Sequence, residues 1–209
     1  MSKQQRRPTP SPKSTVSKPE SRPAIELPDF FRNTRLQSLL VFAFAFLLYA
    51  NTLTHGFVQD DAIVITDNMF TSQGVKGIPG ILSKDTFFGF FKVEGKETLV
   101  SGGRYRPLTL VIFALLYQVV GNSPFVFHLL TVLLFAFTSV VLYRTLLLLL
   151  EGWTTARGQA PLVAWIATLL FAAHPIHTEV VANIKGCDEI ITLLGSLGAL
   201  LFTVKYVDT

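Results

Sequence analysis

Three polar clusters interrupt a chain that is otherwise strongly apolar, and they contain the residue types that could do chemistry. They are Asp60 with Asp61, Arg104 with Arg106, and a third group made of His174, His177, Glu179, Lys185, Asp188 and Glu189. Carboxylates, guanidiniums and imidazoles beside apolar helices of bilayer length cost several kcal/mol unless they pair, face water or bind a ligand. We therefore interpret the clusters as parts of one active site at a membrane surface.

The composition predicts which elements must position these clusters. Half of the 209 residues are hydrophobic and 15% are charged, which fits a polytopic membrane protein better than a soluble domain. We predict an all-α fold with about four transmembrane helices, over residues 36–53, 125–150, 161–184 and 190–207. The apolar run from 161 to 173 would be only about 20 Å long as a helix, so we expect that helix to continue past His174.

Residues 1–35 are predicted to be a disordered, basic cytoplasmic tail. They are rich in proline, serine and lysine, and they cannot bury enough apolar surface to offset the entropy of ordering. Basic residues before the first apolar run place the N-terminus in the cytoplasm and favour a retained signal anchor. No nucleic-acid-binding fold follows the tail, so we expect no nucleic-acid partner. The single cysteine, Cys187, cannot form an intramolecular disulfide.

The segment Leu108–Val120 decides whether the clusters can meet. It is apolar but only about 20 Å long as a helix, and it lies between Pro107 and Gly121. We interpret residues 108–120 as an interfacial or re-entrant helix inside a non-cytoplasmic loop over residues 54–124. The acidic pair and the histidines then face the same compartment, whereas a spanning helix would separate them. Their convergence into one site favours the non-spanning interpretation.

Four short motifs together resemble a known family. They are Phe-Val-Gln-Asp-Asp at 57–61, Tyr-Arg-Pro-Leu at 105–108, Leu-Phe-Ala-Ala-His-Pro-Ile-His-Thr-Glu at 170–179, and Gly-Cys-Asp-Glu at 186–189. This set is similar to the N-terminal part of the transmembrane and tetratricopeptide-repeat O-mannosyltransferases, which are GT-C glycosyltransferases, and to their bacterial relatives. Family members have more spans and usually a C-terminal tetratricopeptide array. Their last motif commonly reads Gly-Arg-Ala-Asp, so the cation is displaced here to Lys185.

The resemblance implies a chemistry for the acidic pair. An enzyme of this class moves a sugar, here expected to be mannose, from a polyprenyl phosphate to an acceptor hydroxyl, expected to be a protein Ser or Thr, and inverts the anomeric carbon. A carboxylate that takes the acceptor's proton during attack contributes on the order of 10² to 10⁴ in rate. We assign Asp60 as this base, and Asp61 as a catalytic neighbour that holds a cation or orients the acceptor.

The resemblance also implies roles for the remaining polar residues. Fixed cations suit the phosphate of the donor, so we expect Arg104, Arg106 and Lys185 to bind it. Substrate contacts are expected from His174, His177, Glu179, Asp188 and Glu189. No residue is assigned to a metal and no cofactor is expected beyond the lipid-linked donor. The expected partners are that donor, a protein or glycan acceptor, membrane lipids, and either an oligomer or a C-terminal tetratricopeptide region outside this chain.

Simpler interpretations of the same residues stay open. The acidic pair could cap the following helix, and the two arginines could be anchors that snorkel to the headgroups. His174 before Pro175 could mark only a helix terminus. Two other functional classes compete as well: a membrane metalloenzyme, because imidazole and carboxylate groups are suitable zinc ligands, and a non-enzymatic membrane scaffold or truncated subunit.

Overall fold

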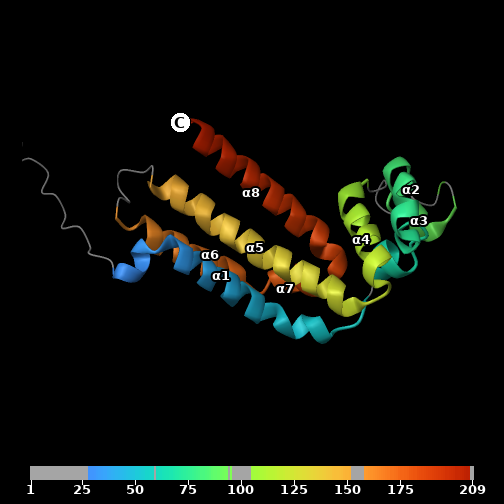
Figure 1. Cartoon of the computed structure of the whole chain (residues 1–209), viewed down its shortest axis with the longest axis horizontal. Helices are drawn as coiled ribbons and strands as arrows, with labels where there is room; N and C mark the ends of the chain where they lie inside the picture. Colours follow the sequence, from blue (N-terminus) through green and yellow to red (C-terminus); the bar gives the residue numbers. More distant parts are fainter. Residues whose placement is uncertain (1–27, 59, 94, 96–104, 152–157, 208–209) are drawn as a thin grey trace, which may run out of the picture.

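The computed structural model describes residues 28–58, 60–93, 95, 105–151 and 158–207. Within these residues the protein is built from helices and connecting turns, without a strand, so the predicted all-α class is confirmed (Figure 1). Arg104 and most of the predicted tail lie outside the described residues, and their assignments stay predictions.

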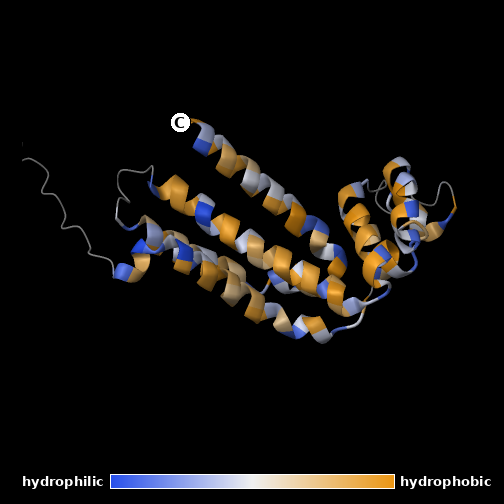
Figure 2. Ribbon diagram, viewed as in Figure 1, coloured by the Kyte–Doolittle hydropathy of each residue, from blue (hydrophilic) through white to orange (hydrophobic). Residues whose placement is uncertain are grey.

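Three helical stretches are long and apolar enough to cross a membrane. The first is α1, Thr34–Tyr49, continued by the 3-10 turn η2, Ala50–Thr54; the second is α5, Pro124–Glu151. The third is the turn η7, Ile184–Gly186, followed by α8, Cys187–Val207. Hydrophobic residues predominate along these helices (Figure 2), so the protein is an integral membrane protein by the length and composition of its helices.

The expected span over 161–184 is wrong as a single helix. Helix α6 covers Ala160–Ala173, and a separate short helix α7 covers His177–Ala182. His174 adopts an extended backbone with ψ of 128°, because the following Pro175 disfavours helical geometry in its predecessor and has no N–H to donate. At about 21 Å, α6 falls short of a bilayer core of roughly 30 Å.

Helix α5 is the centre of the bundle, because it packs against α1, α6 and α8 (Figure 1). Small residues such as Ala160 and Ala164 let α6 approach α5, and the buried Tyr143 fills the space beside them. Tyr143 also hydrogen-bonds Gln37 of α1, whose side-chain amide donates to the Phe30 carbonyl at 2.8 Å. A buried glutamine is therefore satisfied from two directions, which sets α1 against α5.

The last part of the predicted disordered tail is ordered instead. A 3-10 helix, η1, covers Asp29–Arg32, and α1 begins at Thr34. The ring of Phe30 packs edge-on against Trp165 of α6 with 5.4 Å between centroids. The Asn33 side chain accepts from the Leu36 N–H at 3.0 Å and caps α1. The aromatic contact and the helix cap stabilise this part of the tail, whose proline-rich composition alone predicts disorder.

Short helices between α1 and α5 form a second region at one end of the bundle (Figure 1). They are the π-helical turn η3 (Ala62–Thr66), the 3-10 helix η4 (Thr71–Gly77), α2 (Ile78–Ser83), α3 (Phe88–Phe91) and α4 (Pro107–Val120). The buried Asn68 holds them together: its amide donates to the carbonyls of Ile63 and Thr86, and its oxygen accepts from the Phe70 and Thr71 N–H groups.

Helix α4 is the segment that decides the topology, and it packs mainly against η4 rather than within the bundle. Its 14 residues match the predicted helix at 108–120, extended by Pro107 at its start. Its length is below that of a membrane span, as expected for an interfacial helix. Its depth in a bilayer stays a prediction.

Candidate active site

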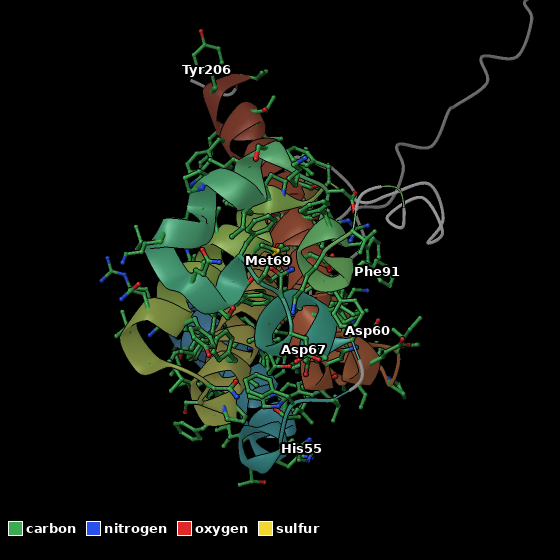
Figure 3. The ribbon with its side chains drawn as sticks, turned by 90° about the vertical axis from the view of Figure 1, so that its right-hand side faces the viewer. His55, Asp60, Asp67, Met69, Phe91 and Tyr206 are labelled. Atoms are coloured by element: carbon green, nitrogen blue, oxygen red, sulfur yellow. The ribbon has the colours of Figure 1, made fainter. Side chains whose placement is uncertain are left out.

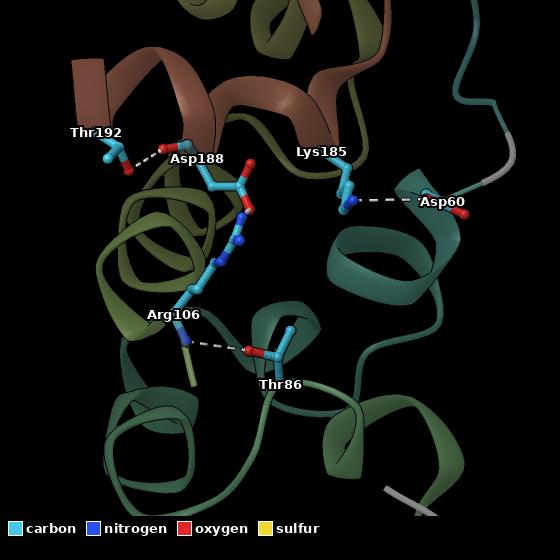
Figure 4. A network of polar contacts seen from close by, with 6 residues as sticks. All are labelled: Asp60, Thr86, Arg106, Lys185, Asp188 and Thr192. Atoms are coloured by element: carbon cyan, nitrogen blue, oxygen red, sulfur yellow. Dashed lines mark hydrogen bonds and ion pairs between the residues drawn. The ribbon is translucent and has the colours of Figure 1, made fainter. Parts of the chain in front are cut away.

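Asp60 and Lys185 form the first of two ion pairs at this end of the molecule. Asp60 lies just before η3, and Lys185 lies in the η7 turn between α7 and α8. Lys185 Nζ is 3.7 Å from Asp60 Oδ2 (Figure 4). The Asp60 side chain is 49% exposed, so its carboxylate is accessible from the surface. Figure 3 views this end directly and places Asp60 beside the ribbon of α7 and α8.

Arg106 and Asp188 form the second ion pair. Arg106 immediately precedes α4, and its backbone N–H donates to Thr86 Oγ1 at 3.4 Å (Figure 4). Its guanidinium Nη1 donates to Oδ2 of Asp188, in the first turn of α8, where the helix dipole favours a carboxylate. Asp188 is only 11% exposed, and its Oδ1 has no hydrogen-bond partner among the described residues. One buried acceptor oxygen is thus available to a ligand.

Both pairs face one cavity of about 200 Å³. Its lining consists of these four charged residues together with Ile63, Val64, Thr86, Phe87, Thr109 and Leu110. The two carboxylates neutralise the two cations, and the rest of the lining is both polar and apolar. The cavity therefore offers a proton acceptor beside cations that can bind an anion. The structure therefore brings together Asp60, Arg106 and the segment that carries Lys185 and Asp188, three parts of the chain that are far apart in the sequence.

A wider groove of about 730 Å³ adjoins this cavity between α4 and α8. The two spaces share Arg106, Thr109 and Asp188. Beyond the shared residues the groove is lined by Pro107, Leu108, Glu189, Ile191, Thr192, Leu193 and Ser196. The charged pair of Arg106 and Asp188 thus stands where a small polar cavity meets a larger groove with apolar walls.

Asp61 occupies a different position from its neighbour. It is fully buried and does not line the cavity. Its Oδ2 accepts from the Val58 N–H at 3.0 Å, and its Oδ1 accepts from the Lys185 N–H at 2.9 Å. Burial raises the pKa of the Asp61 carboxyl, while these two N–H groups and the nearby His128 act to lower it. Asp61 therefore fastens the acidic loop to the turn that carries Lys185.

The histidine motif does not line this cavity. His174 is exposed, and its Nδ1 accepts from the Ile176 N–H at 3.3 Å within its own turn. His177 packs on Phe171 and Phe135 with centroid distances of 4.3 and 5.4 Å, and burial lowers its pKa. A separate cavity of about 210 Å³ has His177 in its lining. The roles predicted for these histidines stay predictions.

The two remaining predicted acids do not line the ion-pair cavity. Glu179 is exposed on α7, whereas Glu189 lines both the groove and the cavity beside His177. Within the described part of the chain, no three His, Cys, Asp or Glu side chains gather closely enough to hold a metal ion. This geometry gives the metalloenzyme interpretation no support.

The contacts between Asp60, Asp61 and Lys185 also bear on topology. They join the loop after α1 to the turn before α8, so both lie at the same end of the bundle. A spanning α4 would carry the chain to the opposite end, but α5 begins at the same end as the acidic loop, where His128 contacts the Gly56 carbonyl (Figure 1). The arrangement favours the non-spanning interpretation of α4.

Sequence reasoning missed two supporting residues, Asn68 and Thr86, and assigned no structural role to a third, Gly186. Asn68 and Thr86 look like ordinary loop residues in the sequence. In the structure Asn68 hydrogen-bonds several backbone groups of the loop, and Thr86 Oγ1 accepts from the Arg106 N–H. Gly186 had a detectable signal as the small residue of a motif. A Cβ at Gly186 would lie 2.5 Å from the Val180 carbonyl oxygen, so only glycine lets η7 pack this closely on α7.

Comparisons with curated proteins identify relatives over most of this chain. Human protein O-mannosyl-transferase TMTC1 is 34% identical over 162 residues, which are 78% of this chain and 17% of that protein. Human TMTC3 is 34% identical over 73% of this chain and 15% of its own length, and human TMTC2 is 32% identical over 83% and 19%. The chain spans about a sixth of the length of the first two relatives. No protein-family model and no solved structure matches it.

Proposed function

We propose a function from the premise that this chain is a homologue of the TMTC protein O-mannosyltransferases, the family that its motifs resemble. It takes part in transferring mannose from a polyprenyl-phosphate-linked donor to a protein Ser or Thr hydroxyl, with inversion at the anomeric carbon. The reaction takes place at the cavity lined by Asp60, Arg106, Lys185 and Asp188. The juxtaposition of an accessible carboxylate with two cations is the observation that carries this proposal.

Asp60 is the general base in this scheme. A Ser or Thr hydroxyl is too weakly acidic to ionise in advance, so its proton must leave during attack. As the acceptor oxygen bonds to the anomeric carbon, Asp60 takes that proton, and the bond from the anomeric carbon to the phosphate oxygen breaks. The electron pair of the broken bond stays with the polyprenyl phosphate. The half-exposed position of Asp60 supports this role, because the acceptor must reach it from solvent.

Arg106 and Lys185 stabilise the phosphate in this scheme. Each is already held by a carboxylate, which keeps the cation in the cavity before the donor arrives. The donor phosphate takes over contacts now made by Asp60 and Asp188, which also frees Asp60 to act as base. The unpartnered Oδ1 of Asp188 is positioned to accept a hydrogen bond from a sugar hydroxyl. Charge-assisted hydrogen bonds of this kind contribute about 1.5–3 kcal/mol each.

The groove between α4 and α8 suits the polyprenyl chain of the donor. Its walls include Leu108, Ile191 and Leu193, and it meets the cavity at Arg106, where the phosphate would lie. Only 6% of the apolar stretch of the α8 segment is buried inside the protein. The groove beside α8 is therefore open to the lipid side. We place the site on the non-cytoplasmic face and the N-terminus in the cytoplasm, following the basic residues before α1.

The test is Asp60→Asn in membranes that contain the protein, with polyprenyl-phosphate mannose and a Ser/Thr peptide as substrates. The amide keeps the shape but cannot take the proton, so transfer should fall by roughly 10² or more. Asp67→Asn is the matched control, because Asp67 is an exposed acid in the same loop. Equal transfer by the Asp60 and Asp67 variants would remove Asp60 from the mechanism. Absence of transfer by the wild-type chain would favour the non-enzymatic membrane subunit.

A further inference from the structure

The end of the bundle opposite the active-site cavity carries a shallow basin of about 550 Å³ lined by three arginines. We call it the arginine basin; it is formed by Arg32, Asn33, Thr34, Arg35 and Arg144. Among the described residues, no carboxylate belongs to its lining. Figure 1 shows that the start of α1 and the far end of α5 lie together here, away from α4. The basin is therefore distinct from the proposed donor site.

The fold fixes one arginine of the basin, Arg144, in place. Arg144 of α5 donates from Nε to Ser38 Oγ of α1 at 2.9 Å, which turns its guanidinium toward the start of α1. The residues preceding these two, Tyr143 and Gln37, form the buried hydrogen bond that sets the spacing of the helices. The convergence of Arg144 with Arg32 and Arg35 thus follows from core packing and not from flexible surface side chains alone.

Among the described residues, the lining of the basin holds three arginines and no acid. Arg32 pairs with Asp29 at 3.4 Å, but the two side chains are 82% and 93% exposed, and such a pair exchanges easily with solvent or another anion. The start of α1 adds to the positive potential, because the first N–H groups of a helix have no acceptor within it. Of these groups, the Asn33 side chain accepts only from the Leu36 N–H. An incoming anion would relieve the repulsion among the guanidiniums.

The position of the basin indicates which anion it meets. It lies at the start of one membrane-spanning helix and near the end of another, where lipid headgroups lie. Leu36 and Leu39 of α1 are 40% and 63% exposed beside it, so an acyl chain can lie along α1 while its headgroup occupies the basin. From this geometry we infer that the arginine basin binds the phosphate group of an anionic membrane lipid. Guanidiniums suit this group because their paired N–H donors match phosphate oxygens.

The test measures lipid binding by the purified chain, and it does not depend on sugar transfer. Native mass spectrometry or a melting-temperature shift compares phosphatidic acid with phosphatidylcholine, for the wild type and for the double variant Arg35→Gln with Arg144→Gln. The double variant should bind phosphatidic acid about tenfold more weakly or worse. Lys76→Gln, at an exposed lysine of η4 at the other end, should bind it as the wild type does. Arg144→Lys should keep part of the affinity, because the charge remains.

The outcomes separate a lipid from a soluble anion. Preference for phosphatidic acid that the double variant loses, with no response to inorganic phosphate, supports the lipid site. A stabilisation by inorganic phosphate alone that the double variant also loses overturns the lipid assignment. Equal binding of phosphatidic acid by the wild type and the double variant overturns the site itself. Melting of each variant in phosphatidylcholine gives its own baseline, because Arg144→Gln also removes the hydrogen bond to Ser38 Oγ. The shift caused by phosphatidic acid is measured from that baseline, which separates lipid binding from a change in stability.

Discussion

The ion-pair cavity and the histidine turn are neighbours in the chain near residue 180, yet they use their polar groups in opposite ways. In the cavity, Arg106 contacts Asp188 across 82 residues of sequence, and beneath it the Lys185 N–H donates to Asp61 across 124. In the turn, His174 contacts its own segment, and His177 packs on aromatic rings. A dense sequence motif can thus serve a local change of chain direction, while the candidate site is assembled from scattered charges.

The largest expected effect is the all-or-none labelling of engineered cysteines, which tests whether both regions share one face. Ser72→Cys in η4 and Ile176→Cys in the histidine turn should react with an impermeant maleimide from one side of sealed vesicles. Gln159→Cys, before α6, should react only from the other side. Native Cys187 is fully buried and should not react with the maleimide, so it gives no background labelling. Reaction of Ser72→Cys and Ile176→Cys from opposite sides would break the single-site arrangement.

The next effect concerns the connection beneath the cavity. Asp61→Ala should lower the free energy of unfolding by about 2 kcal/mol or more, because it leaves the buried N–H groups of Val58 and Lys185 without their acceptor. Thermal unfolding in detergent measures this. Asp67→Ala, at an exposed acid six residues later, should change stability little. Equal melting temperatures of the two alanine variants would show that Asp61 does not hold the loop to the η7 turn.

A smaller effect is expected from Arg106, where the cavity meets the groove. Arg106→Ala should weaken use of the lipid donor by roughly tenfold to a hundredfold, the equivalent of one charge-assisted contact of about 1.5–3 kcal/mol. Arg106→Lys should recover only part, because a point charge does not reproduce the guanidinium fork. Transfer rates measured over a range of donor concentrations give the result. Unchanged donor dependence in both variants would make Arg106 an interfacial anchor.

The smallest effect belongs to the histidine turn. Because burial against aromatic rings lowers the pKa of His177, the folded state binds fewer protons than the unfolded state just below the ordinary value of about 6.5. Stability should therefore fall as pH drops through that window. His177→Gln should flatten this dependence in unfolding measured from neutral to mildly acidic pH. An unchanged slope would show that His177 does not carry it.

The sequence predicted the fold better than it predicted the partners of each polar residue. The lengths of the apolar runs predicted α1, α5 and α8, because a membrane span needs a long uninterrupted apolar run, which is visible in the sequence. The break at His174 was visible in Pro175, but the short apolar run before it argued for a longer helix. The contrast between Asp60 and Asp61 could not be foreseen. Adjacent acids differ only through which backbone N–H groups the tertiary fold brings to them.

The paired charges of the cavity and the surplus charge of the arginine basin should respond differently to ionic strength. Screening acts over about 8 Å at physiological salt, and it weakens fields that extend into solution. The cavity balances two carboxylates against two cations, so added salt has little external field to screen there. The basin is lined by three arginines, and its lining holds no carboxylate among the described residues, although Arg32 pairs with the exposed Asp29. Added salt should therefore release an anion from the basin at concentrations that hardly change anion binding in the cavity.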